Sequence, residues 1–380
     1  MNRLPLSPGE RDAAFMDRAL QLAADARAHC PPNPAVGCVI ADDLGHVLGQ
    51  GRTQAAGQAH AEIMALRDAA AQGCDVRGAT VYVTLEPCAH QGRTGPCCEA
   101  LIAAGVGRVV AAVQDPNPRV AGQGLARLRG AGVAVEVGLR EPQAREMNLG
   151  FFSRMLRGTP WVRLKIAASL DGRTALPNGA SQWITSEAAR ADGHAWRARA
   201  GAVLTGIGTV LADDPLLNVR LPQASRQPDL VVADSRLQLP LAAGLWSVPQ
   251  RRVLIYTASA DAARAQALTA RGATVVHLPS PAGQVALPAM LQDLARREIN
   301  DLHVEAGARL NGALLRAGLV DELLVYQAPR LLGEGAGMAA LGVFEQLAQA
   351  PQFEWHAADR VGSDLRLRAR RPLGDAALTV

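Results

Sequence analysis

The sequence predicts an α/β fold in each of two domains, and three observations support this. Candidate strands and helices alternate along the whole chain, which is typical of layered α/β structure. The chain has 380 residues, more than one typical domain, and its hydrophobic fraction of 49% is enough for two cores. All six cysteines fall at or before Cys98, and the second half repeats the strand–helix alternation without repeating the motifs of the first.

The first half is expected to begin with a helix. Ser7 can cap it, Pro8 suits the first helical position, and Glu10 completes a capping box. The helix should end before Pro31 and Pro32. The further elements predicted in this half are strands at 33–40, 47–51, 80–85, 108–113 and 133–137, and helices at 60–71, 97–104, 122–129 and 142–157.

The second half shows the same alternation. Strands are predicted at 162–168, 202–206, 230–233, 252–256, 274–277, 302–305, 323–328, 353–356 and 365–367, and helices at 186–198, 262–270, 287–297 and 310–317. The run Arg157-Gly158-Thr159-Pro160 breaks the pattern between the halves. We therefore expect a first domain of residues 1–150 and a second of residues 159–380.

The stretch from His60 to Cys97 has the residue types of a catalytic zinc site. His60, Cys88 and Cys97 can hold zinc and leave its fourth position open, whereas a structural site would be closed by a fourth protein ligand. Glu62 follows the histidine by two residues, so it is expected beside the metal, where it can move protons. Two other interpretations are a structural zinc site and a disulfide framework. The length of the chain, the lack of a signal peptide and the Pro-Cys motif argue against disulfides, and we expect a reducing cytoplasm.

Composition narrows the class of partner. The net charge is only +4, from 39 Lys+Arg against 35 Asp+Glu, which is too small an excess of positive charge to indicate a surface that binds a polyanion. Aromatic residues make up 3% of the chain, so few can stack on bases. No apolar run reaches the roughly 18 residues of a membrane span. A small anionic substrate suits this balance of charge and aromatic content better than a nucleic acid polymer, and no membrane partner is expected.

The motifs of the first half resemble the deaminase half of the bifunctional riboflavin-biosynthesis deaminase/reductase family. They are His60-Ala61-Glu62, Thr84-Leu85-Glu86-Pro87-Cys88, Gly92-Arg93-Thr94-Gly95-Pro96-Cys97-Cys98, Asn33-Pro34-Ala35-Val36-Gly37-Cys38 and Gln114-Asp115-Pro116-Asn117-Pro118. Eight residues separate Cys88 from Cys97, where polynucleotide deaminases usually have two. One departure is Ala59, where the family usually has proline. The resemblance implies a cytidine-deaminase-like three-layer α/β/α domain, with His90 and Arg93 as contacts to base and phosphate; Arg93 could equally be an ordinary exposed arginine.

The second half resembles the reductase half of the same family. The runs that carry this resemblance occur in the family's order and are Ser169-Leu170-Asp171-Gly172-Arg173, Ser181-Gln182-Trp183-Ile184-Thr185, Gly208-Thr209-Val210-Leu211-Ala212-Asp213-Asp214-Pro215 and Val304-Glu305-Ala306-Gly307. The resemblance covers nearly the whole chain. It implies a dihydrofolate-reductase-like α/β domain that uses NADPH, although a Gly-x-Gly-x-x-Gly fingerprint is missing.

Site residues follow from the resemblance. It implies Zn²⁺ on His60, Cys88 and Cys97, with Glu62 as the catalytic residue. The residues implied for NADPH are Ala167, Trp183, Thr209, Asp213, Ser235, Gly307, Ala308, Arg309, Leu310, Asn311, Gly312 and Ala313. Those implied for the substrate are Ser181, Arg197, Leu217, Arg220 and Glu305. Lys165 is expected near the ribose, and Trp183 could instead be a core aromatic.

The resemblance also implies the reactions. The substrate is 2,5-diamino-6-ribosylamino-4(3H)-pyrimidinone 5′-phosphate, whose 2-amino group is hydrolysed before NADPH reduces the ribosyl chain to ribityl. The product is 5-amino-6-ribitylamino-uracil 5′-phosphate, and the enzyme is expected to be a homo-oligomer. Two competing hypotheses are a deaminase joined to a reductase-like domain that only binds or assembles, and a nucleic-acid editing protein. The intact second-half motifs argue against the first, and the charge and aromatic content against the other.

Overall fold

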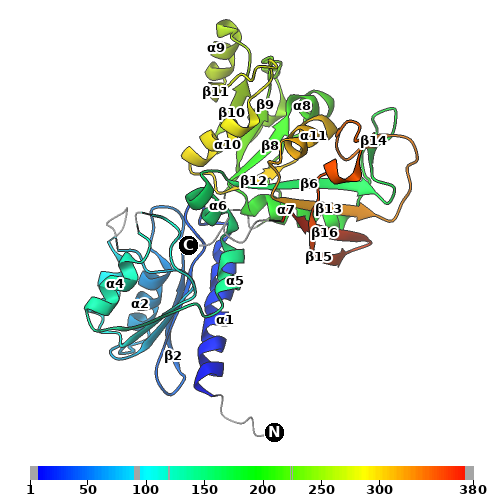
Figure 1. Cartoon of the computed structure of the whole chain (residues 1–380). Coiled ribbons are helices and arrows are strands. Elements are labelled where there is room, and N and C mark those ends of the chain that lie inside the picture. The colour runs from blue at the N-terminus through cyan, green and yellow to red at the C-terminus, as the bar shows by residue number, and fades with distance from the viewer. Residues whose placement is uncertain (1–6, 90–94, 119, 223, 225, 373–380) are drawn as a thin grey trace. The chain divides into compact units, whose positions relative to one another are not determined.

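The computed structural model describes residues 7–89, 95–118, 120–222, 224 and 226–372 (Figure 1). The chain forms two compact units, the first ending at Arg157 and the second beginning at Gly158. In the described part of the chain, none of the helices has the length and apolar character needed to cross a membrane.

The first unit contains a mixed five-stranded sheet in the order β2-β1-β3-β4-β5. Strand β1 (Gly37–Ala41) pairs antiparallel with β2 (Val47–Arg52) and with β3 (Thr80–Val83). Strands β3, β4 (Arg108–Ala111) and β5 (Ala134–Val137) run parallel. The five strands begin and end within a few residues of their predicted bounds, apart from β1, which starts four residues later.

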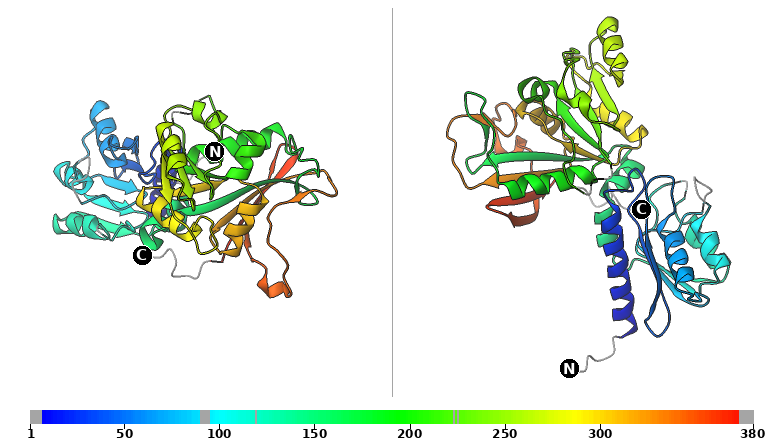
Figure 2. Two further views of the ribbon diagram at one scale, coloured as in Figure 1. Left: turned by 90° about the horizontal axis from the view of Figure 1, so that it is seen from above. Right: turned by 180° about the vertical axis from the view of Figure 1, so that it is seen from behind.

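Helices cover both faces of this sheet, which gives the expected three layers (Figures 1 and 2). Helices α1 (Pro8–Ala26) and α5 (Glu141–Met147) lie on one face, and α2 (Ala61–Ala71), α3 (Cys97–Ala103) and α4 (Gln123–Gly130) lie on the other. The capping box at Ser7 is confirmed, because Ser7 Oγ accepts from the Glu10 N–H while the Glu10 carboxylate accepts from the Ser7 N–H.

Glycine allows α2 to approach the sheet closely. A Cβ atom added to Gly51 on β2 would lie 2.4 Å from the Ala61 carbonyl oxygen, in the first turn of α2. No side chain fits there, so the turn that begins next to His60 is held directly against the strand.

The predicted single helix 142–157 is wrong. The chain forms α5 and then α6 (Leu149–Arg157), with a break at Asn148. The Asn148 side chain accepts from the Ala35 N–H at 2.8 Å and donates to the Ala35 carbonyl at 2.9 Å. These buried bonds hold Asn148 at φ −125°, outside helical geometry, so the helix is interrupted there.

The second unit contains a nine-stranded sheet in the order β11-β10-β9-β8-β12-β6-β13-β16-β15. The strands from β11 to β13 are parallel, and β16 and β15 are antiparallel to their neighbours. Their bounds are β6 (Trp161–Ser169), β8 (Ala202–Gly206), β9 (Asp229–Ala233), β10 (Val253–Thr257), β11 (Ala273–His277), β12 (Asp301–Val304), β13 (Glu322–Ala328), β15 (Glu354–Val361) and β16 (Asp364–Arg370).

The helices of this unit are α7 (Glu187–Arg199), α8 (Ile207–Asp213), α9 (Ala262–Ala270), α10 (Leu287–Arg296) and α11 (Ala308–Arg316). Helices α10 and α11 share one core with the inner strands, where Leu164 and Leu302 are fully buried. Trp196 of α7 packs with Leu324 and Tyr326 of β13 in a separate cluster.

Several small elements were not predicted: α8, the two-stranded sheet of β7 (Arg173–Ala175) and β14 (Ala336–Gly337), and the short 3-10 helices η1 (Gly244–Ser247) and η2 (Leu347–Gln349).

The parallel strands bring distant residues to one edge of the sheet. The carboxyl ends of neighbouring parallel strands lie together, and ligands of open α/β sheets bind at such edges. Strands β6, β8, β9 and β12 end here at Ser169, Gly206, Ala233 and Val304. Glu305 and Ser235 follow β12 and β9 by one and two residues, and Thr209 and Gly307 follow β8 and β12 by three, so this edge holds residues implied for both the cofactor and the substrate.

Candidate active sites

The three predicted zinc ligands come from three different elements. His60 is the N-cap residue of α2, and its side chain makes no cap hydrogen bond, so the imidazole is available to a metal. Cys88 follows the end of β3 by five residues, and Cys97 is the first residue of α3. Strand β3 and the first turns of α2 and α3 therefore meet at this site.

The three ligand atoms fit one tetrahedral zinc ion. His60 Nδ1 lies 3.4 Å from Cys97 Sγ and 3.6 Å from Cys88 Sγ, and all three ligand atoms lie within 4.8 Å of one another. Zinc bonds of about 2.0–2.1 Å to nitrogen and about 2.3 Å to sulfur, at tetrahedral angles, place N and S about 3.6 Å apart. Among the residues that the structure describes, these three form one ligand cluster, and three protein ligands are the number typical of a catalytic zinc site.

The surroundings of Cys88 favour its thiolate, the form that binds zinc. Hydrogen bonds from the Cys97 thiol and from His60 lower the pKa of Cys88 to about 4, against the opposing effect of burial. The backbone N–H of Cys97, at the start of α3, also donates to Cys88 Sγ at 3.4 Å. The hydrogen bond between the two thiols raises the pKa of the Cys97 thiol, so Cys88 is the sulfur that is deprotonated before a cation binds.

Glu62 lies beside the ligands in the first turn of α2 and is 3% exposed. Burial, and next the charge of Cys88, raise the pKa of Glu62 to about 7. A carboxyl group that titrates near neutral pH can both accept and deliver a proton during turnover. The geometry therefore suits the proton-transfer role that the sequence predicts for Glu62. His90 and Arg93, expected as base and phosphate contacts, lie outside the described residues.

Arg197 and Glu305 form the centre of the predicted substrate site in the second unit. Arg197 Nε lies 2.6 Å from Glu305 Oε1, and Arg197 Nη2 lies 2.9 Å from Glu305 Oε2. Lys165 Nζ lies 3.8 Å from Glu305 Oε2. Burial alone would raise the pKa of Glu305, but Arg197, His303 and Lys165 hold it well below its usual value. The carboxylate is therefore ionised and orients two cations.

The loop after α8 brings Leu217 and Arg220 to the same place. Arg197 also donates to the Asn218 carbonyl, and the Arg220 N–H donates to His194 Nδ1 at 3.4 Å. Burial, followed by the charges of Arg197 and Arg220, lowers the pKa of His194 to about 4, so this ring is neutral and accepts a hydrogen bond at pH 7. Arg197 and Lys165 thus pair with one carboxylate, and the exposed Arg220 lies on the neighbouring loop, so that positive charge exceeds negative charge here, as a phosphate site requires.

The residues expected at NADPH lie along the adjoining edge of the sheet. Ala167 is on β6, Thr209 and Asp213 are on α8, and Ser235 follows β9. Gly307 is the N-cap residue of α11 and makes no side-chain cap, and a Cβ atom placed on it would lie 3.8 Å from Thr209 Oγ1. The start of α11 therefore lies beside α8, and its first N–H groups have no side-chain cap, as a phosphate cradle requires. Ala308, Arg309, Leu310 and Ala313 continue this helix.

Two expected cofactor residues of α11 also contact protein. The Asn311 side chain is buried and donates to the Met338 carbonyl at 2.9 Å. A Cβ atom on Gly312 would lie 2.1 Å from the Ala340 carbonyl oxygen. These two residues hold the segment around residues 338–340 against the helix, which leaves the start of α11 as the part that faces a ligand.

Trp183 is not a core aromatic. Its side chain is 58% exposed, and the Arg190 guanidinium lies 4.5 Å from its ring centroid. The interpretation as a core residue is therefore wrong. Ser181, two residues before it, is half-buried in the same segment.

Sequence reasoning missed several residues of this site. His194 contacts both Arg197 and Arg220, His303 is fully buried with Nε2 3.5 Å from Glu305 Oε1, and Arg251 donates to the Leu217 carbonyl. His303 lies two residues before Glu305 on β12, so strand periodicity would have placed both on one face. His194 lies three residues before Arg197, the spacing of neighbours on a helix.

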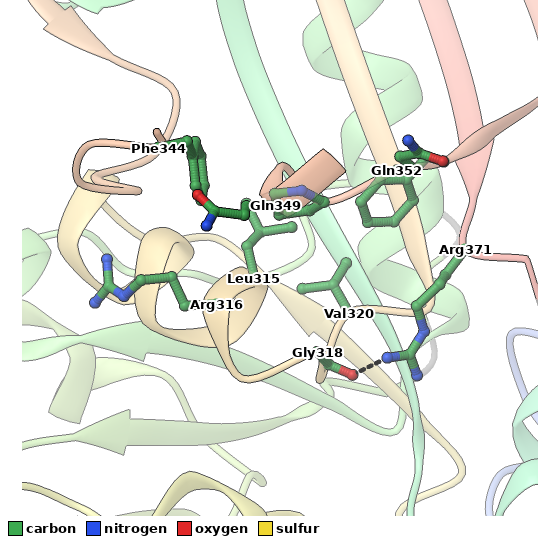
Figure 3. A pocket seen from close by; sticks show the side chains of 10 residues that line it. Leu315, Arg316, Gly318, Val320, Phe344, Gln349, Gln352 and Arg371 are labelled. Atoms are coloured by element: carbon green, nitrogen blue, oxygen red, sulfur yellow. Dashed lines mark hydrogen bonds between the residues drawn. The ribbon is translucent and has the colours of Figure 1, made fainter. Parts of the chain in front are cut away.

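The second unit also has a pocket of about 430 Å³, whose lining includes none of these residues; Figure 3 shows it from close by. Arg371 donates there to the Gly318 carbonyl. The residues that line it are Leu315, Arg316, Gly318, Val320, Phe344, Gln349, Pro351, Gln352, Phe353 and Arg371. It adjoins the carboxyl end of α11, whereas the predicted cofactor residues adjoin the amino end, so it is not part of the predicted reductase site.

Comparison with protein families agrees with this two-site organisation. Residues 9–113 match the cytidine and deoxycytidylate deaminase zinc-binding region, and residues 160–367 match the RibD C-terminal domain. The second match alone spans more than half of the chain.

Full-length relatives extend the likeness. The chain is 47% identical over 365 residues to riboflavin biosynthesis protein RibD of Escherichia coli K12, covering 94% of this chain and 98% of the relative. It is 42% identical to RibD of Haemophilus influenzae, with 94% and 96% covered.

Solved structures share the fold. Acinetobacter baumannii RibD superposes with a TM-score of 0.87 at 43% identity, covering 96% of this chain and all of that one. A diaminohydroxyphosphoribosylaminopyrimidine deaminase/5-amino-6-(5-phosphoribosylamino)uracil reductase of Thermotoga maritima superposes with a TM-score of 0.84 at 30% identity, with 96% and 100% covered. The chain therefore belongs to the RibD family of bifunctional deaminases and reductases of riboflavin biosynthesis.

Proposed function

We propose that this chain hydrolyses the 2-amino group of 2,5-diamino-6-ribosylamino-4(3H)-pyrimidinone 5′-phosphate and then reduces the ribosyl side chain of the product to ribityl, using NADPH. The observation that carries the first step is the cluster of His60 Nδ1, Cys88 Sγ and Cys97 Sγ beside the buried Glu62. Membership of the RibD family supports both steps.

In the deaminase site, His60, Cys88 and Cys97 hold zinc, which when bound supplies Lewis-acid activation of water. Glu62 takes the proton from the attacking water, because its raised pKa makes it a competent base near neutral pH. The same carboxyl then delivers the proton to the departing amine, so that ammonia leaves as the pyrimidine carbonyl forms.

In the reductase site, NADPH when bound supplies a hydride to C1′ of the opened ribose. The start of α11 and Thr209 on α8 hold the cofactor's phosphates, where helix N–H groups without a side-chain cap lie beside a hydroxyl. Arg197 and Arg220 bind the 5′-phosphate of the substrate. Glu305 orients Arg197 through two hydrogen bonds and keeps it from turning away when no substrate is bound.

The decisive experiment is incubation of purified protein with the diaminopyrimidinone phosphate, with and without NADPH, followed by mass analysis. Without NADPH, the product should show the replacement of one amine by oxygen. With NADPH, it should also gain two hydrogen atoms. Deamination with no reduction under any condition would instead support the hypothesis of a second unit that only binds or assembles.

We also propose that the protein is a homo-oligomer of the cytoplasm. β15 is an edge strand of the nine-stranded sheet, and Trp355 on it is 73% exposed, which favours contact with another copy. None of the six cysteines is in a disulfide, which suits a reducing compartment. Size-exclusion chromatography with light-scattering detection should give a molecular mass above that of one chain.

A further inference from the structure

Glu86 is a buried carboxylate near the zinc ligands for which the deamination mechanism has no use. It is 3% exposed and lies two residues before Cys88. Its carboxylate accepts backbone N–H groups from a segment that begins almost 30 residues later. Glu86 Oε2 accepts from Asp115 at 3.0 Å and from Gly122 at 2.9 Å, and Glu86 Oε1 accepts from Gly124 at 2.9 Å and from Leu125 at 3.3 Å.

Two of these donors belong to the first turn of α4, which has no cap of its own. The N-cap residue is Gly122, and no side chain of the helix's own N-cap accepts its first N–H groups. A carboxylate at a helix start satisfies such donors and interacts favourably with the helix dipole. Glu86 therefore acts as a cap supplied from another part of the chain, and it ties α4 and the Asp115 turn to the end of β3.

The backbone next to Glu86 is equally constrained. A Cβ atom on Gly124 would lie 1.9 Å from the Pro87 carbonyl oxygen, so α4 lies directly against the residue between Glu86 and Cys88. The Glu86 N–H donates to the Val113 carbonyl at 2.9 Å. With proline fixing its own φ angle, little freedom is left on the amino-terminal side of Cys88.

Cys88 is held from its other side by α3. The Cys98 N–H donates to the Cys88 carbonyl at 3.2 Å, and the Cys97 N–H donates to Cys88 Sγ at 3.4 Å. The position of the Cys88 thiolate relative to His60 thus depends on two attachments, the Glu86 carboxylate and the start of α3. Only the second includes a metal ligand itself.

We propose that Glu86 is a positioning residue of the deaminase site, which fixes the Cys88 thiolate for zinc by accepting the backbone N–H groups of Asp115, Gly122, Gly124 and Leu125. The proposal rests on the assignment of zinc to His60, Cys88 and Cys97. Groups outside the ligand set that orient the ligands typically contribute about 10–100-fold to metal affinity. Glu86 differs from the usual case because it acts through the backbone on a cysteine, with no hydrogen bond to the ligand atom.

The test uses the full-length protein with Glu86→Gln, which keeps the shape of the side chain but turns an NH₂ group toward two N–H donors. Zinc affinity is measured by competition with a chelator, and the cobalt-substituted protein is examined by its thiolate-to-cobalt charge-transfer absorption. We expect about 10–100-fold weaker zinc binding and a changed cobalt spectrum, together with a lower deaminase kcat and little change in KM.

Glu99→Gln is the matched control. Glu99 lies on α3 and pairs with Arg127 on α4 at 2.5 Å, so it also links these two helices, but its side chain is 45% exposed and the partner of its carboxylate is Arg127. This variant should keep the wild-type zinc affinity and cobalt spectrum. NADPH-dependent reduction of supplied deaminated intermediate should be unchanged in both variants.

Wild-type zinc affinity together with a wild-type cobalt spectrum in Glu86→Gln would overturn the proposal, and would leave Glu86 as a cap for α4. If Glu86→Gln is not recovered folded, Glu86→Asp is measured in the same way, because it keeps the charge and shortens the reach by one methylene. A wild-type result there would overturn the proposal equally. Failure of the wild-type protein itself to bind zinc would count against the proposed function as well. A loss of the proposal about Glu86 alone is distinguished from this, because the wild-type protein would then still bind zinc.

Discussion

Arg197 and Glu305 form a two-point ion pair across the carboxyl edge of the second sheet, with N–O distances of 2.6 and 2.9 Å. Arg197 lies in the last turn of α7, and Glu305 directly follows β12. The pair gives one of the expected phosphate-binding cations a defined orientation before any substrate arrives, which reduces the ordering cost of binding.

Glu305→Gln should therefore weaken the reductase while leaving the deaminase unchanged. The amide can accept from only one side of the Arg197 guanidinium and carries no charge. We expect kcat/KM for reduction to fall. The loss of transition-state stabilisation calculated from it should be about 1.5–3 kcal/mol, the range for a hydrogen bond to a charged group. Steady-state rates of both reactions on the same preparation measure this.

Asp229→Asn is the control for this variant. Asp229 pairs with Arg252 at 2.6 Å but lies at the first residue of β9, at the opposite end of the strands. It should keep the wild-type reductase rate. A parallel loss in both variants, or a loss of deamination in Glu305→Gln, would show that the effect arises from general destabilisation.

Glu62→Gln should separate metal binding from proton transfer. The amide is almost the same shape, and none of the three ligands is altered, so zinc content should stay near one ion per chain. Deamination should fall by about 10²-fold or more, the scale of a lost general acid–base group. Metal analysis and single-turnover deamination on the same sample measure both quantities, and a variant with undiminished deamination would assign the proton to another group.

The residues predicted from local sequence were placed well, because their positions depend on local structure. His60 and Cys97 were expected at helix starts and Cys88 after a strand, and the structure has all three there. The spacing of one histidine, one acid and two cysteines is enough to predict such a site, since each ligand is presented by an element that the sequence pattern reveals.

Long-range contacts could not be predicted in the same way. Arg197 and Glu305 are 108 residues apart, and they meet because β12 inserts between β8 and β6, an order that sequence periodicity does not reveal. The contacts of Glu86 could not be predicted either, because its four N–H donors lie 29 to 39 residues later in the sequence and are brought to it by tertiary structure. Helix α8 was missed because two glycines lie at its start, at its N-cap and second residues, and weaken the local helix signal.

Glu322 should make the second unit sensitive to acid. Its side chain is fully buried, and Arg163 Nη2 lies 3.2 Å and Arg368 Nε 3.1 Å from its carboxylate oxygens. Burial alone would raise its pKa, but Arg163, Arg370 and Arg368 outweigh this and lower the pKa of Glu322 to about 2. A carboxyl with a depressed pKa stabilises the fold above its unfolded pKa, and that contribution is lost as pH falls toward the folded value.

The expected window therefore runs from about pH 4.5 down to about pH 2. Glu322→Gln should lower the unfolding free energy of this unit at pH 7 by about 3 kcal/mol, and the difference from wild type should shrink as pH falls through the window. All five tryptophans lie after residue 158, so urea unfolding followed by tryptophan fluorescence reports on the second unit alone. A difference that stays constant down to pH 2.5 would contradict the assignment.

The separation of the two activities along the chain remains a prediction, and fragments test it. The zinc ligands and Glu62 all precede residue 150, while every residue implied for NADPH follows residue 159. The boundary between the two compact units lies between Arg157 and Gly158, directly after α6. A fragment of residues 1–157 keeps Asn148 bonded to Ala35, so it should fold and bind about one zinc ion.

A fragment from residue 159 should bind NADPH, which is measured by fluorescence energy transfer from its tryptophans to the nicotinamide. Ending the first fragment at residue 147 removes the Asn148 bonds and is expected to lower its melting temperature, because the Ala35 N–H and carbonyl would be left unsatisfied. Zinc binding that required the second fragment to be present would show that the deaminase site is not complete within the first unit.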